Sequence, residues 1–163
     1  MLTSLLQNRT HWAVEGRGAW LREGDAADTR LQCATFRDSD AGLVIVGSAS
    51  HNTPDTQAFV ADYASPKFTQ LGSSLKLLLV AEGAAHVYPR LAPTCEWDTA
   101  AAHAVVLEAG GTVLAAGECD SKGVLLPGVA WREALAQQRP VSYNKPNALN
   151  PFFVVYGKRI NKD

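Results

Sequence analysis

The feature that most restricts the fold of this sequence is a regular alternation of short β-branched runs and helical segments after residue 41. The run Leu43-Val44-Ile45-Val46 has the composition of a strand buried on both faces. Further strands are expected at 68–71, 86–88, 112–114 and 152–156, and helices at 53–64, 75–82, 97–109 and 130–138. Strands that alternate with helices in this way form a layered α/β sheet.

The residues before this region follow a different pattern. Residues 10–22 predict a β-hairpin that carries Trp12 and Trp20 on either side of a glycine-containing turn. An isolated hairpin is marginal in water and needs further strands or a helix to cover it, so we expect that its packing partners are missing from the short sequence before it. We therefore expect two units: residues 1–40 as the last hairpin of a truncated α+β domain, and residues 41–163 as an α/β domain.

Three other segments show no regular pattern. Residues 89–93 are expected to form a loop, residues 117–128 an irregular excursion, and residues 158–163 a solvated tail. Trp97 and the alanines that follow it are expected in the core.

Composition and charge exclude several classes of protein. A chain of 163 residues that is 47% hydrophobic and 19% charged can bury a core, unlike a disordered chain. The net charge of −1 provides no basic surface for nucleic acid or an anionic membrane, and no apolar run approaches the roughly 18 residues of a spanning helix. The N-terminus lacks the pattern of a secretory signal. Cys33, Cys95 and Cys119 are too widely spaced for a zinc site and fit a reducing compartment. We expect a cytoplasmic protein, or a plastid protein if a transit peptide lies upstream.

Polar residues follow three of the predicted strands, where ligands gather in open α/β sheets. The residues at these junctions are His51, then Gly72, Ser73, Ser74 and Lys76, and finally Asp98. Free N–H groups and the dipole at each helix start favour an anion. Lys76 and Arg90 add positive charge, and Arg90 can hold a phosphate through two parallel hydrogen bonds.

Each of these residues also has an ordinary structural explanation. The serines at 73–74 can be a helix N-cap alone, and His51 can be an unremarkable loop histidine. Asp98 can cap a helix or interact with its dipole. Lys76 and Arg90 can be surface charges. Taken singly, these residues indicate no more than an α/β domain that tolerates phosphate.

A longer motif carries a family resemblance. The segment WDTAAAHAVVLEAGG, residues 97–111, resembles the second signature of the inositol monophosphatase superfamily. Within that superfamily, SASH at 48–51, GSSLK at 72–76 and YPRLAPTCEWD at 88–98 are similar to the 3′(2′),5′-bisphosphate nucleotidases of the CysQ type. The likeness extends from the hairpin to NPFFVV at 150–155 and implies the αβαβα sandwich of this superfamily.

The resemblance implies an activity and the residues that serve it. The activity is that of a Mg²⁺-dependent phosphatase that removes the 3′-phosphate of adenosine 3′,5′-bisphosphate to give AMP, with 3′-phosphoadenylyl sulfate as a second substrate. Asp98 is implied as a metal ligand. The implied contacts to nucleotide and phosphate are His51, Gly72, Ser73, Ser74, Lys76 and Arg90. The alternatives are an inositol monophosphate phosphatase and a non-catalytic remnant that binds a nucleotide phosphate.

The chain also departs from the pattern of the superfamily. The resemblance implies further metal ligands in an N-terminal half, from a Glu-Glu pair and an Asp-Pro-Ile/Leu-Asp-Gly-Thr segment, and neither motif occurs in this sequence. One carboxylate cannot organise two Mg²⁺ ions, because the attacking water and the leaving oxygen both need coordinated partners. We therefore expect the C-terminal half of a bisphosphate nucleotidase, inactive alone, whose partner is a missing or separately encoded N-terminal half.

Overall fold

The computed structural model describes residues 2–4, 8–48, 52–72, 75–117 and 130–160. The first sheet of the described chain has the order β1-β2-β3-β4, from β1 (Leu2–Ser4), β2 (Arg9–Val14), β3 (Gly18–Glu23) and β4 (Thr29–Arg30). The central sheet has the order β7-β6-β8-β10-β9, from β6 (Val44–Ser48), β7 (Lys67–Leu71), β8 (Val87–Arg90), β9 (Thr112–Ala115) and β10 (Phe153–Tyr156). A short pair joins β5 (Thr35–Phe36) to β11 (Lys158–Arg159).

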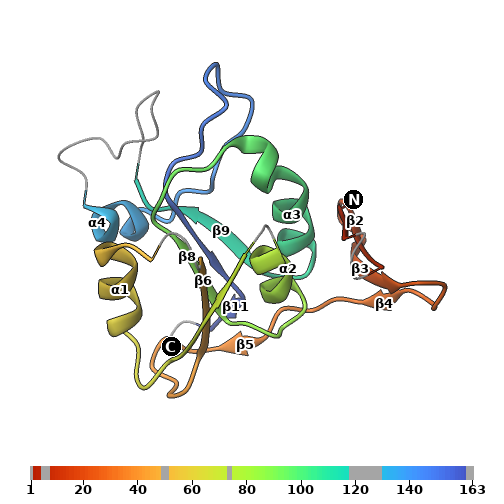
Figure 1. The fold of residues 1–163 in the computed structure, drawn as a ribbon, viewed down its shortest axis with the longest axis horizontal. Coiled ribbons are helices and arrows are strands. Elements are labelled where there is room, and N and C mark those ends of the chain that lie inside the picture. Colours follow the sequence, from red (N-terminus) through yellow and green to blue (C-terminus); the bar gives the residue numbers. More distant parts are fainter. Residues whose placement is uncertain (1, 5–7, 49–51, 73–74, 118–129, 161–163) are drawn as a thin grey trace.

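Helices separate and cover these sheets. They are α1 (Pro54–Ala61), α2 (Leu75–Ala81), α3 (Glu96–Glu108) and α4 (Trp131–Ala136). Figure 1 shows the layers side by side, with α1 and α4 on one face of the central sheet and α2 and α3 on the other. The β1–β4 sheet lies outside α2 and α3 and packs on α3. The predicted alternation of strands and helices, and with it the α/β class, is confirmed.

Strand β10 shows why a strand of the central sheet appears in the sequence as a continuous run of apolar residues. Its four residues are all buried. Phe153 and Val155 belong to the core beneath α2 and α3, whereas Val154 and Tyr156 belong to the core beneath α1 and α4. Successive side chains of a strand point to opposite faces, so a strand covered by helices on both sides must be apolar throughout.

The strand directions determine where the helices begin. Strands β7 and β8 both run parallel to β6, whereas β10 runs antiparallel to β8 and β9. The carboxyl ends of β6, β7 and β8 therefore meet at one edge of the central sheet. Because α2 follows β7 and α3 follows β8 in the chain, both helices start from this edge.

The ends of the helices follow local signals in the sequence. Thr53 caps α1 by accepting a hydrogen bond from Thr56 N, and Pro54 occupies the first turn. At the end of α3, Gly110 has a φ of +90°. A Cβ at Gly111 would lie 2.6 Å from the carbonyl oxygen of Tyr156, so the end of α3 packs against β10 more closely than a larger residue allows.

The predicted hairpin is present and has partners that the sequence did not reveal. Strands β1 and β4 flank it, and its His11, Ala19 and Leu21 face is buried. On the opposite face Trp12 and Trp20 stack with their ring centroids 4.3 Å apart and remain half-buried. The expectation that the hairpin lacks packing partners is therefore wrong for one of its two faces.

Two glutamates attach this hairpin to the helices. At the end of α3, Glu108 accepts hydrogen bonds of 2.9 Å from the backbone N–H groups of Gly16 and Gly18. Just beyond α2, Glu82 accepts from Arg9 Nη2 at 3.0 Å and lies 2.6 Å from His11 Nε2. Both α2 and α3 are thus held to the hairpin near the end that lies away from the central sheet edge.

Two further expectations are corrected by the pairing of strands. Pro89 and Arg90 extend β8 opposite β10 instead of forming a loop, because β8 pairs with β6 only at Val87 and the N–H that proline lacks is not needed there. Residues 158–160 are not a solvated tail, since Lys158 N and Ile160 N donate to the carbonyls of Ala34 and Phe36. Residues 161–163 lie outside the described residues.

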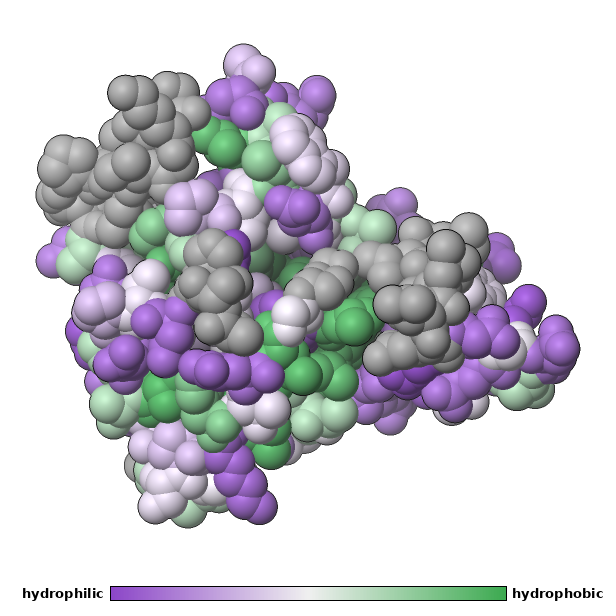
Figure 2. Space-filling model, in the orientation of Figure 1, coloured by the Kyte–Doolittle hydropathy of each residue, from purple (hydrophilic) through white to green (hydrophobic). Residues whose placement is uncertain are grey.

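The surface is divided between polar and apolar regions. Figure 2 shows hydrophilic residues at the outer end of the β1–β4 sheet and hydrophobic ones near α2. Exposed charged residues at that outer end include Arg22, Asp28 and Arg30. Within the described ranges, no helix has the length and apolarity needed to cross a membrane.

We predict that Glu82→Gln weakens the attachment of the hairpin to α2. Burial alone would raise the pKa of the Glu82 carboxyl, but the hydrogen bonds and charges of His11 and Arg9 outweigh it and hold this pKa below its ordinary value. The variant should lose about 2 kcal/mol of unfolding free energy at pH 7, as measured by urea denaturation.

The loss should depend on pH in one direction. A carboxyl with a lowered pKa stabilises the folded state above its unfolded pKa, and this contribution disappears as the pH falls through the folded pKa. The difference between wild type and Glu82→Gln should therefore shrink below about pH 4.5. As a control, Asp62→Asn breaks an exposed pair with Arg132 and should cost less than about 1 kcal/mol. Equal losses in the two variants would contradict the prediction.

Candidate active site

The sequence predicts seven site residues, and the structure describes four of them: Gly72, Lys76, Arg90 and Asp98. Three lie outside the described residues, and their roles stay predictions: His51, Ser73 and Ser74. The four described residues all follow or end the strands whose carboxyl ends meet at one edge of the central sheet.

Lys76 is a buried cation and not the surface charge that its ordinary explanation suggests. It lies in the first turn of α2 with 3% of its surface exposed. Its Nζ donates to the carbonyl of Leu71 at 3.0 Å and lies 5.3 Å from the ring centroid of Tyr88. Burial, followed by the positive charge of Arg90, lowers the pKa of Lys76 from 10.5 to about 8.

Arg90 lies at the end of β8 and has an unused hydrogen-bond donor. Its Nη2 donates to the carbonyl of Pro93 at 2.9 Å. Its Nε is buried and has no hydrogen-bond partner among the described residues. A buried donor without an acceptor destabilises a protein by about 1–3 kcal/mol, and an anionic oxygen is the acceptor that a guanidinium prefers.

Tyr88 connects the charged residues of this edge. Burial raises the pKa of its hydroxyl to about 12, the charge and hydrogen bond of Arg90 oppose this shift, and the negative charge of Asp98 adds to it. Lys76 and Arg90 thus lie at one buried aromatic side chain, and Asp98 is near enough for its charge to affect the pKa of that side chain.

Gly72 leaves open space at the end of β7. A Cβ at this position would meet no atom within 4 Å among the described residues. Its backbone does not adopt the left-handed conformation that requires glycine. Contacts within the described protein therefore do not explain the glycine, and close approach of a ligand to the backbone remains the predicted role.

Asp98 lies in the first turn of α3 and caps the helix. Its side chain is exposed, and its Oδ2 accepts a hydrogen bond of 2.9 Å from Cys95 N. Oδ1 has no hydrogen-bond partner among the described residues. The capping role that the sequence left open is therefore present, and one carboxylate oxygen is left for another ligand.

The chemistry of Asp98 fits Mg²⁺ as a single ligand. This ion prefers carboxylate oxygens and is often bound through one or two carboxylates, with water and substrate phosphate completing its coordination. No group of three or more His, Cys, Asp or Glu side chains suited to a metal occurs within the part of the chain that the structure describes. Asp98 can thus contribute one ligand to a magnesium site but cannot form one with its described neighbours.

The neighbouring tryptophan contradicts a prediction. Trp97 was expected in the core, but 73% of its surface is exposed. The buried face of α3 instead consists mainly of small and β-branched residues, including Ala102, Val105 and Val106. Trp97 and Asp98 are neighbours in the same exposed first turn of α3.

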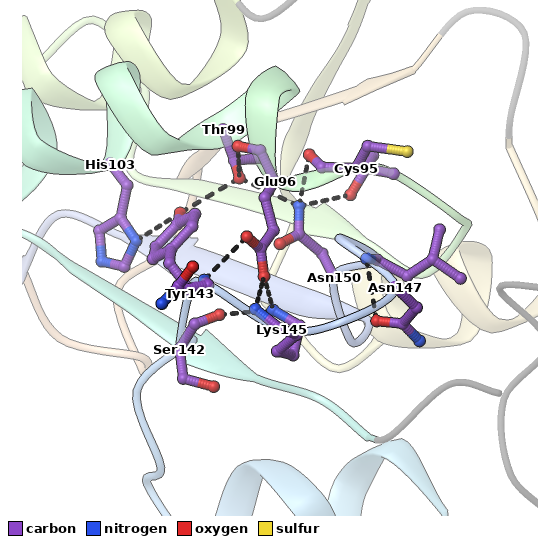
Figure 3. A network of polar contacts seen from close by, with 12 residues as sticks. Cys95, Glu96, Thr99, His103, Ser142, Tyr143, Lys145, Asn147 and Asn150 are labelled. Carbon is purple, nitrogen blue, oxygen red and sulfur yellow. Dashed lines mark hydrogen bonds and ion pairs between the residues drawn. The ribbon is translucent and has the colours of Figure 1, made fainter. Parts of the chain in front are cut away.

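A network of polar contacts holds the first turn of α3 to residues 142–150 (Figure 3). Glu96 accepts from the backbone N–H of Asn144 at 2.8 Å and from the N–H and Nζ of Lys145 at 3.0 and 2.5 Å. The hydrogen bond from Lys145 is the main reason that the pKa of Glu96 is lowered. Asn150 contacts the same turn from the other side.

The sequence reasoning missed Glu96, Lys145 and Asn150. Glu96 precedes the Trp-Asp pair, where one acidic residue in a first helical turn carries no distinct signal. The other two lie about 50 residues later in a segment without regular secondary structure. Only the polar character of residues 142–150 between two apolar strands could have drawn attention to them.

The sequence model of the Inositol monophosphatase family matches residues 2–149. The chain belongs to this family. The resemblance inferred from residues 97–111 is thereby confirmed.

Several curated relatives are 3′(2′),5′-bisphosphate nucleotidases of the CysQ type. The chain is 41% identical to the 3′(2′),5′-bisphosphate nucleotidase CysQ of Salmonella typhimurium over 103 residues, which is 63% of this chain and 39% of that protein. It is also 41% identical over 108 residues to CysQ of Escherichia coli, covering 66% of this chain and 42% of that one.

A solved structure from the same family confirms the fold of this chain. The crystal structure of CysQ from Bacteroides thetaiotaomicron aligns with a TM-score of 0.71 and 35% identity, over 95% of this chain and 56% of that one. The chain therefore spans about two fifths of the curated relatives and just over half of this structure.

We predict that replacing the buried cation stabilises the protein. The folded state releases the Lys76 proton near pH 8, whereas the unfolded chain keeps it up to about 10.5. The unfolded state thus binds more protons between these values, so stability should rise with pH across this window. Lys76→Met should remove that rise and increase the unfolding free energy at pH 7 by about 1 kcal/mol or more.

Urea denaturation between pH 7 and 10 measures both effects. Lys145→Met provides a control, because it removes a lysine that is paired with Glu96 and whose loss should be destabilising. A Lys76→Met variant that is less stable than wild type at pH 7 would contradict the prediction that the buried lysine lowers the unfolding free energy.

Proposed function

We propose that this chain forms the C-terminal half of a Mg²⁺-dependent phosphatase of the CysQ type. Its substrate is adenosine 3′,5′-bisphosphate, with 3′-phosphoadenylyl sulfate as a second substrate, and hydrolysis of the bond between phosphorus and the 3′-oxygen gives AMP or adenylyl sulfate. The family membership, the 41% identity to CysQ proteins and the two positive side chains at the sheet edge support this proposal.

The observation that carries the proposal is the buried Lys76 beside Arg90. Two positive groups lie around Tyr88, one of them desolvated and the other with a buried, unpartnered Nε. Such an arrangement disfavours the folded state by itself and favours the binding of an anion. A phosphate group would pair with both cations and accept the unused hydrogen bond of Arg90.

Asp98 supplies the opposite charge at the start of α3. A divalent cation held by this carboxylate would bring positive charge to the phosphoryl oxygens and activate water when the site is complete. The described residues offer it a single ligand, so we assign the remaining ligands to an N-terminal half. Residues 1–40 and 41–163 are then the parts of the two domains that this chain contributes, and the chain alone binds nucleotide without turnover.

Isothermal titration with AMP tests the binding half of this proposal. We expect AMP to bind to the isolated chain with a dissociation constant in the millimolar range, and Lys76→Met or Arg90→Gln to weaken binding about tenfold, equivalent to about 1.4 kcal/mol. Arg132→Gln is the matched control, since this exposed arginine pairs with Asp62 between α4 and α1. An absence of heat at millimolar AMP, or equal effects of Arg90→Gln and Arg132→Gln, would contradict the assignment.

Phosphate release tests the catalytic half. The pure 163-residue chain should release negligible phosphate from adenosine 3′,5′-bisphosphate with Mg²⁺, and a protein completed with the N-terminal half of a CysQ relative should release it. Asp98→Asn should abolish that activity. Robust Mg²⁺-dependent release by the isolated chain would overturn the proposal that it is incomplete, and faster release from inositol monophosphate by the completed protein would overturn the choice of substrate.

A further inference from the structure

Asn150 is a buried amide with an unusual set of contacts to the start of α3. It is 1% exposed. Its Nδ2 lies 3.1 Å from Thr94 Oγ1, 2.8 Å from the carbonyl oxygen of Cys95 and 3.0 Å from Thr99 Oγ1. Its backbone N–H donates to the carbonyl of Thr94 at 3.0 Å. One side chain thus holds the residues on both sides of Asp98 (Figure 3).

The amide acts through its donor group alone. The Nδ2 group has two hydrogens for three acceptors, while Oδ1 is buried and has no partner among the described residues. Thr99 is able to accept from Asn150 because its own hydroxyl hydrogen is directed to the carbonyl of Glu96. A buried carbonyl oxygen without a hydrogen-bond partner lowers the unfolding free energy, so the stability of the fold does not by itself explain an asparagine at this position.

The contacts reach the Asp98 carboxylate through Cys95. The carbonyl oxygen of Cys95 accepts a hydrogen bond from Asn150 Nδ2, and the backbone N–H of Cys95 donates one to Asp98 Oδ2. The same peptide segment is therefore fixed from one side by the amide and from the other by the carboxylate. Backbone hydrogen bonds from Glu96 N to Ala148 O and from Asn150 N to Thr94 O also hold this segment. Loss of the amide would remove the side-chain contact to the Cys95 carbonyl and so loosen the peptide whose N–H orients Asp98.

A second attachment lies next to this one. Glu96 is held by Asn144 and Lys145, but its contacts involve the side of the turn that precedes Asp98. They restrain the helix start without contacting either the carbonyl of Cys95 or Thr99. Asn150 is accordingly the side chain whose contacts enclose Asp98.

We propose that Asn150 is a positioning residue for Asp98, and that it holds the free carboxylate oxygen where a divalent cation can bind beside Lys76 and Arg90. The proposal rests on the proposed role of Asp98 as a metal ligand. It concerns how the chain prepares that ligand before any cation is present.

Paramagnetic broadening by Mn²⁺ tests this role without any assay of activity. In the ¹⁵N-labelled chain, MnCl₂ should broaden the amide signals of residues 95–99, and the part of this broadening that depends on Asp98 is defined by the Asp98→Asn variant. Asn150→Leu, which keeps a side chain of similar size, should reduce that part at least twofold. Thr99→Val, which removes one of the three acceptors, should reduce it less.

A variant at the other end of the same helix provides the control. Glu108→Gln disturbs the attachment of α3 to the hairpin and should leave the Asp98-dependent broadening at its wild-type level. Wild-type broadening in both Asn150→Leu and Thr99→Val would overturn the positioning role and leave the proposed function intact. Wild-type broadening that does not depend on Asp98 would overturn the metal-binding role of Asp98 itself. If Asn150→Leu does not fold, Thr99→Val alone decides between these outcomes.

Discussion

The fixed direction of α2 and α3 between two sheets is the constraint on which the rest of the structure depends. Both helices start at the edge where the carboxyl ends of β6, β7 and β8 meet, and both are tied to the hairpin near their other ends by a glutamate. Glu82 is held by Arg9 and His11, and Glu108 by two backbone N–H groups. Because the helices cannot tilt independently, their first turns stay together, and these turns carry Lys76 and Asp98.

Several buried polar groups that disfavour folding lie at the same edge. Lys76 is buried as a cation, Arg90 Nε has no described partner, and Asn150 Oδ1 is buried and unpaired. His11 Nδ1, on the hairpin, is also buried without a described partner, and the core of the central sheet is apolar on both faces. A protein tolerates such groups where binding or catalysis needs them, and the stability of the surrounding layers allows it.

Much of the fold could be predicted because its signals are local. The run at 43–46 and the Thr53-Pro54 helix start depend only on neighbouring residues, and both are confirmed. The exposure of Trp97 could not be predicted, because it depends on which face of α3 meets the central sheet. The strand at 158–159 also escaped prediction, since it forms only through pairing with residues more than 100 positions earlier.

The candidate site divides in the same way. A family motif led to Lys76, Arg90 and Asp98, whereas the burial of Lys76 became visible only once Tyr88 and α2 were in place. Asn150 was missed because its three acceptors lie about 50 residues away in the sequence, and an asparagine in an irregular segment has no pattern that indicates distant contacts.

The titration of Lys76 measures the central claim most directly, namely that the fold gathers two cations at one buried edge. In the chain labelled with ¹³C at lysine Cε, one lysine signal should titrate near pH 8, and Arg90→Gln should move that titration to higher pH because the neighbouring charge is removed. Loss of this signal in Lys76→Met would assign it. If every lysine titrates near the ordinary value of about 10.4, or if Arg90→Gln leaves the titration unchanged, the two cations do not share a buried site.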